Sequence, residues 1–107
     1  MAEDTRAFFE SLSTRGYEPL LHRVSGSYRV DIDRGDGNWQ IWRVAVDHGA
    51  LKVSEDTSNA DCIIKCSQEE FDRLVHGHEN VVAAFLQGQV EVEGNLGLAQ
   101  SFQRLVH

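Results

Sequence analysis

Apolar and polar residues alternate along several short segments of the chain, a pattern typical of β-strands with one buried face. The clearest segment is 24–33, where Val24, Tyr28 and Ile32 fall on one face and serine, arginine and aspartate fall on the other. Similar patterns predict strands at 39–46, 50–54, 60–66 and 89–93, with a tight turn at Asp47-His48-Gly49 between the second and the third. Because the outer faces are mostly polar, we expect one face of the sheet to meet water.

Four other segments have the apolar spacing of helices. The first, 3–15, has an apolar stripe and ends before Gly16. Ser67-Gln-Glu-Glu70 is a capping box that opens a second helix, and a short apolar helix spans 80–87. Asn95 is expected to cap the last helix, whose inward residues are Leu98, Phe102 and Leu105. These elements predict one α+β domain, 1–107, with a five-stranded, largely antiparallel sheet and helices covering one face.

Charge narrows the choice of partners. The 107 residues carry a formal net charge of −7 and contain no basic run, which argues against nucleic acid and against stable anchoring on an anionic membrane. The N-terminus lacks the apolar core of a signal peptide, no segment is apolar enough to span a bilayer, and the last residues, Leu105-Val106-His107, differ from the peroxisomal Ser-Lys-Leu signal. We therefore expect a cytoplasmic protein with a neutral, apolar or cationic partner.

Candidate chemistry is sparse, and we predict no catalytic site, no metal and no cofactor. Cys62 and Cys66 share one predicted strand about 13 Å apart, too far for a disulfide, and are interpreted as buried thiols. His76-Gly-His78 with Glu79 fits a solvated helix end better than a metal site. Asp31 and Asp33 are expected on the water-facing side of their strand, where carboxylates make poor general acids.

The order and spacing of several motifs resemble the sterol-carrier-protein-2 family. The motifs are Ala60-Asp61-Cys62-Ile63-Ile64, Phe71, Leu74, Gly77, Asn80, Ala84-Phe85, Gly88, the run from Val90 to Ala99, and upstream the hairpin of Trp42 to Asp47, Gly49 and Leu51 to Val53. The resemblance implies an apolar tunnel between helices and sheet that holds fatty acyl chains, sterols or similar lipids. Carried over by position, its lining comprises Trp42, Phe71, Leu74, Val75, Val81, Val82, Phe85, Leu98 and Phe102.

The chain departs from the family pattern in two places. Family members commonly have Asn-Pro where this chain has Asn80-Val81, and many have a further C-terminal segment that helps to close the tunnel, whereas this sequence ends at His107. Because empty apolar volume is costly, we expect the tunnel to be occupied, covered by a second subunit, or narrowed by Val82, Phe85 and Phe102. Phe85 and Phe102 are both expected to be buried.

Three functions remain open. The leading hypothesis is non-catalytic intracellular binding or carrying of a hydrophobic small molecule. The alternative is an accessory factor that presents a lipid-like substrate to a separate enzyme or acts through protein contacts. Trp39, Ile41 and Ile63 interrupt the polar sheet face and mark either a self-association strip, as in a homodimer, or scattered surface residues. A small isomerase or dehydratase ranks last, since the inward faces offer only Tyr28 and the two cysteines as ionisable groups.

Overall fold

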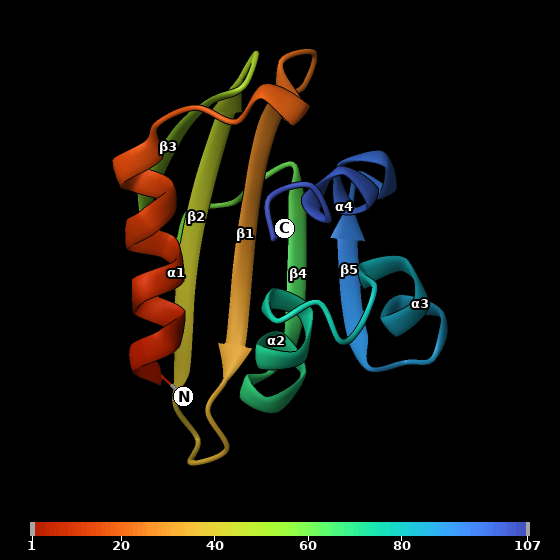
Figure 1. The fold of residues 1–107 in the computed structure, drawn as a ribbon. Coiled ribbons are helices and arrows are strands. Elements are labelled where there is room, and N and C mark those ends of the chain that lie inside the picture. The colour runs from red at the N-terminus through yellow and green to blue at the C-terminus, as the bar shows by residue number, and fades with distance from the viewer. Residues whose placement is uncertain (1, 107) are drawn as a thin grey trace.

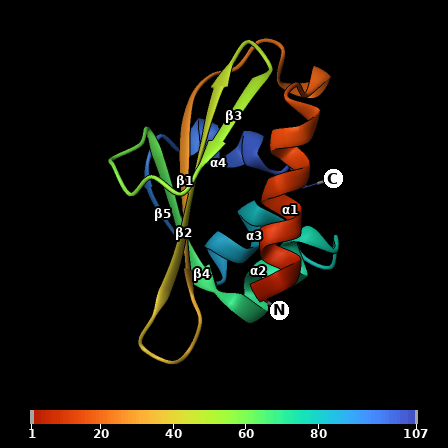
Figure 2. The ribbon, with the colours of Figure 1, turned by 90° about the vertical axis from the view of Figure 1, so that its left-hand side faces the viewer.

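A sheet with its helices on a single face forms the frame of the protein (Figures 1 and 2). The structure is a computed structural model that describes residues 2–106, with side chains from Thr5 onward. His107, part of the C-terminal tripeptide considered above, lies outside the described residues. Figure 2 views the sheet along its edge and shows the helices on one side, so the predicted two-layer α+β architecture is confirmed.

The sheet contains five strands in the order β3-β2-β1-β4-β5. The strands are β1 (Ser25–Asp33), β2 (Trp39–Asp47), β3 (Ala50–Ser54), β4 (Cys62–Ser67) and β5 (Val90–Gly94). The central pair, β1 and β4, is parallel, and the other pairs are antiparallel. His48 and Gly49 link β2 to β3 with φ angles of 49° and 92°, which is the two-residue hairpin turn that the sequence predicts.

Three of the helices, those that start at residues 68, 81 and 96, begin where a polar side chain accepts hydrogen bonds from free backbone N–H groups. The helical elements are α1 (Ala2–Arg15), the 3-10 turn η1 (Pro19–Leu21), α2 (Gln68–Val75), α3 (Val81–Leu86) and α4 (Leu96–Phe102). Ser67 Oγ accepts a hydrogen bond from the N–H of Glu70, and Asn95 Oδ1 accepts one from Leu98, which confirms both predicted caps. The turn η1 was not predicted, because it is a single turn started by Pro19.

An aromatic stack fills the space between α1, α2 and the sheet. The ring of Phe9 lies nearly parallel to that of Trp42, with centroids 4.8 Å apart, and nearly parallel to that of Phe71, with centroids 5.7 Å apart. Phe8 meets Phe71 edge-on, and the guanidinium of Arg6 lies 5.3 Å from the Trp42 ring. This contact between α1, β2 and α2 closes one end of the core.

The outer sheet face is less simple than the alternation predicts. Asp31 is only 5% exposed, so the prediction that it faces water is wrong. Residues two apart share a strand face, and Arg29 covers Asp31 with two hydrogen bonds of 2.9 Å between guanidinium and carboxylate. Ile63 is also buried, between its register neighbours Arg29 and Glu93, while Trp39 stays 51% exposed.

Candidate ligand-binding site

An open apolar groove of about 250 Å³ lies where α3, β5 and α4 meet. Its walls are apolar except for one amide side chain. They are formed by Val81, Val82, Phe85, Leu86, Val92, Leu96, Ala99 and Gln100. The resemblance implied a tunnel enclosed between helices and sheet, whereas this hollow lies at the edge of the helical layer.

Local sequence fixes the elements that border the groove. Asn80 Oδ1 accepts hydrogen bonds from the N–H groups of Val82 and Ala83 and thereby starts α3. At the other end of β5, Gly94 has a φ of +88°, and a side chain there would collide with the carbonyl of Asp61. The N–H of Asn95 donates to the same carbonyl at 2.9 Å. Because residue 94 is a glycine, the backbone just before α4 can approach and hydrogen-bond to the residue just before β4.

Large apolar side chains around the groove remain in contact with water. The exposed fractions are 39% for Val82, 37% for Phe85, 77% for Leu86 and 57% for Leu96. The expectation that Phe85 is a buried ring is wrong. Helix α3 is apolar all round but only its Val81 and Ala84 side packs inward, so the remaining apolar residues face outward.

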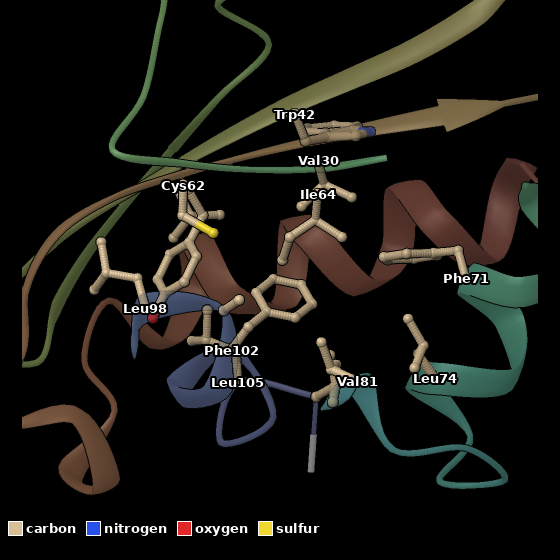
Figure 3. Close-up of a cluster of buried hydrophobic side chains, with 14 of the residues drawn as sticks. Val30, Trp42, Cys62, Ile64, Phe71, Leu74, Val81, Leu98, Phe102 and Leu105 are labelled. Carbon is tan, nitrogen blue, oxygen red and sulfur yellow. The ribbon is translucent and has the colours of Figure 1, made fainter. Parts of the chain in front are cut away.

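The nine predicted lining residues separate into two groups. Val81, Val82 and Phe85 line the groove. Trp42, Phe71, Leu74, Leu98 and Phe102 are buried in the core, where Figure 3 shows most of them converging beneath the sheet. Val75 is partly buried and borders a separate small hollow under α1. Of the three residues expected to narrow a tunnel, only Phe102 lies inside.

Five groove residues were absent from the sequence prediction: Leu86, Val92, Leu96, Ala99 and Gln100. Val92 could have been found, since its alternation within β5 places it on the helix-bearing face of the sheet. Leu86 and Leu96 lie at helix ends, where apolar spacing does not indicate orientation.

The two cysteine thiols and the Tyr28 hydroxyl are held in their neutral forms. Burial raises the pKa of the Cys62 thiol to about 11 and that of Cys66 to about 12, and it also raises the pKa of the Tyr28 hydroxyl. A thiol that keeps its proton is a poor nucleophile. Among the described side chains, no three histidine, cysteine, aspartate or glutamate residues gather in a way that would hold a metal ion. Within residues 2–106, no helix combines the length and apolar character needed to cross a bilayer.

Comparison with known proteins agrees with this fold. Human sterol carrier protein 2 is 31% identical over 90 residues, which make up 82% of this chain but only 16% of the human protein. The non-specific lipid-transfer protein-like 1 of Caenorhabditis elegans is 23% identical, over 99% of this chain and 92% of that protein. The solution structure of sterol carrier protein domain 2 from Helicoverpa armigera superposes with a TM-score of 0.74 at 26% identity, covering 94% of this chain and 85% of that one. The model of the SCP-2 sterol transfer family matches residues 7–107, and the chain belongs to that family.

Proposed function

We propose that this domain binds a hydrophobic small molecule in the groove of α3, β5 and α4 and carries it without changing it chemically. The observation that carries the proposal is the gathering of exposed apolar side chains around a hollow with no charged residue in its wall. A ligand there would remove both its own surface and that of Phe85 and Leu86 from water. Such burial contributes roughly 25 cal/mol per Å² of apolar surface.

The names of the relatives support carriage rather than another role. One is called a sterol carrier protein and another a lipid-transfer protein-like protein, and both names describe movement of an apolar molecule. Because the chain spans only 16% of the human protein, we do not assign the substrates of that whole protein to this chain. We propose a hydrophobic ligand as a class and leave sterol as one member of it.

The groove offers little for catalysis, which supports a non-enzymatic role. General acid–base or nucleophilic catalysis needs a titratable group within hydrogen-bond reach of the ligand, and none of the eight lining residues is titratable. Tyr28, Cys62 and Cys66, the groups on which an isomerase or dehydratase would depend, are fully or almost fully buried and protonated.

The remaining sequence-based hypotheses stay predictions. An accessory role through Trp39 and Ile41 is not favoured, because burial of Ile63 leaves a smaller apolar strip than the sequence indicated. Homodimer formation, a cytoplasmic location and the absence of nucleic-acid partners are likewise predictions from composition and pattern.

Titration with Nile red, a neutral dye whose emission rises in apolar surroundings, tests the proposed function. We expect saturable binding to the wild-type chain and at least tenfold weaker binding to Phe85→Asp, because a carboxylate in the groove must lose hydration when the dye binds. Trp39→Asp is the matched control, since it places the same charge at an exposed aromatic position on the other sheet face and should bind like wild type. Absence of saturable binding, or equal binding by Phe85→Asp, would contradict the proposal.

A further inference from the structure

One edge of β2 is only partly covered by its neighbour β3. Residues 43–47 of β2 pair with residues 50–54 of β3, so residues 39–42 of β2 have no neighbouring strand on that side. Figure 2 shows the hairpin of β1 and β2 continuing beyond the end of β3. A strand edge that no other element covers is a template for pairing with another chain.

Two residues present free backbone groups at this edge. The N–H of Arg34 donates to the carbonyl of Asn38, so the even-numbered residues of β2 face β1 and the odd-numbered ones face away from it. Trp39 and Ile41 therefore direct their N–H and C=O groups past the end of β3. Among the described residues, these backbone groups find no hydrogen-bond partner.

A hollow of about 340 Å³ lies against the free edge. Trp39 and Ile41 form the apolar part of its lining, and Trp39 is 51% exposed. Arg34 and Glu55 also line the hollow. Glu55 forms an exposed ion pair with Arg6 at 3.2 Å, whereas Arg34 forms no ion pair with a described residue. The edge thus combines free hydrogen-bonding groups, apolar surface and charges of both signs.

We propose that two copies of this chain associate by pairing the free edges of β2 antiparallel, across a twofold axis at Gln40. Trp39 of each copy then lies opposite Ile41 of the other, so their free N–H and C=O groups meet. Their side chains share the outer sheet face as an aromatic and β-branched pair, which is a favourable cross-strand combination. The buried Oε1 of Gln40 has no hydrogen-bond partner among the described residues, and in this register it lies opposite the amide of the second Gln40.

Charge favours a second copy over a foreign strand at this edge. The β1–β2 loop comes just before Trp39, so in the antiparallel register it lies beside the end of β3 of the second copy, where Glu55 follows. Arg34 belongs to that loop and meets an opposite charge there. Twofold symmetry repeats the Arg34–Glu55 contact on both sides of the axis and leaves no site for a third copy. Because the paired segment is short, the dimer is weak and reversible.

This dimer is independent of the proposed ligand site. The groove borders β5, and the proposed interface lies at β2, near the other edge of the sheet. Pairing at β2 therefore leaves the groove open, and the inference stands whether or not the groove binds a ligand.

Sedimentation equilibrium between about 10 μM and 1 mM protein tests the inference, and we expect wild type to pass from monomer to dimer in this range. Trp39→Ser should weaken the dimer about tenfold, because each dimer loses the cross-strand pair twice. Ile41→Pro should weaken it at least as much, since proline removes an outward N–H and spares the bonds to β1. Leu20→Ser is the matched control, because Leu20 is 55% exposed on η1, and it should dimerise like wild type.

Exchange of the two charges tests the register. Arg34→Glu and Glu55→Arg should each weaken self-association about 5- to 10-fold, because like charges then meet twice in each dimer. An equimolar mixture of these two variants should dimerise about as well as wild type, since the mixed pair has opposite charges at both contacts. Urea denaturation verifies that every variant is folded.

Three results would overturn the proposal. The first is a wild type that stays monomeric throughout the concentration range, which would leave the β2 edge to a foreign strand. The second is dimerisation that Trp39→Ser and Ile41→Pro leave unchanged, or that Leu20→Ser weakens as much, because the interface would then lie elsewhere. The third is a mixture of the charge variants that dimerises no better than either variant alone, since Arg34 and Glu55 would then not meet across the axis.

Discussion

Phenylalanine occupies two different environments in this chain, one at each end of the helical layer. Under α1 and α2, Phe9 and Phe71 are fully buried in a stack with Trp42. At α3, Phe85 is partly exposed beside an open groove. The first region presents a 14-residue helix and an amphipathic 8-residue helix to the sheet, whereas α3 has 6 residues and is apolar on every side.

The two regions show how one fold can separate stability from binding. A long amphipathic helix buries its whole apolar stripe and leaves polar residues to the solvent. A short helix that is apolar all round cannot bury every face against one sheet, so some of its side chains stay available to a ligand. The aromatic end of the core can then hold the fold together while the α3–α4 end remains open.

Truncation of the phenylalanine rings should give the largest difference in stability between the two regions. We expect Phe71→Ala and Phe102→Ala each to lower the free energy of unfolding by about 3–5 kcal/mol, because each leaves a cavity in a packed core. Phe85→Ala should cost less than about 1 kcal/mol, since its ring is already partly in water. Urea denaturation measures all three, and a loss at Phe85 as large as that at Phe71 would abolish the distinction between the regions.

Much of the fold could be predicted because local rules decide it. Ser67 and Asn95 begin their helices as their side chains indicate, and strand alternation identifies the buried face of β1. Asp31 was misplaced because alternation treats each residue alone, whereas the structure pairs it with Arg29. The Arg29–Asp31 pair covers part of the outer face of the sheet, and the alternation of single residues does not predict such a pair.

The site was less predictable than the fold. A core and a lipid groove are built from the same residue types, so composition cannot separate Phe102, which is buried, from Phe85, which borders the groove. Tertiary packing decides these points.

Alkaline pH should lower the stability of the fold through its two thiols, which lie towards opposite ends of β4. The unfolded thiol has a pKa of about 8.5. Burial, together with the nearby carboxylates of Glu70, Asp31 and Asp72, raises the pKa of Cys66 to about 12, whereas the pKa of Cys62 is raised to about 11. Above pH 8.5 the unfolded chain loses a proton that the folded chain keeps, so stability falls as pH rises.

We therefore expect wild type to lose about 1–2 kcal/mol more stability than Cys66→Ala between pH 8 and pH 10, at up to about 1.4 kcal/mol per pH unit. Cys62→Ala should show a difference of the same sign and nearly the same size, because the pKa values of both folded thiols lie above pH 10. Urea denaturation at pH 8 and pH 10 gives the loss of stability of each protein. Because each variant is compared with itself at the two pH values, the effect of its substitution on core packing cancels. Identical pH dependence in wild type and Cys66→Ala would show that the thiol is hydrated.

The smallest effects concern the caps of the helices, one from each region. Ser67 Oγ accepts one N–H at the start of α2, and Asn80 Oδ1 accepts two at the start of α3, at 2.9 and 3.3 Å. Loss of such a cap typically costs about 1 kcal/mol, so Ser67→Ala and Asn80→Ala should lower the free energy of unfolding by similar amounts in urea. Of these two helices only α3 borders the groove, and local loosening there should disturb the positions of Val82 and Phe85. Nile red should consequently bind several-fold more weakly to Asn80→Ala and equally to Ser67→Ala and wild type. If the two variants lose equal stability and bind Nile red equally well, then the structure of α3 does not determine binding in the groove. The two regions would then not differ in their roles.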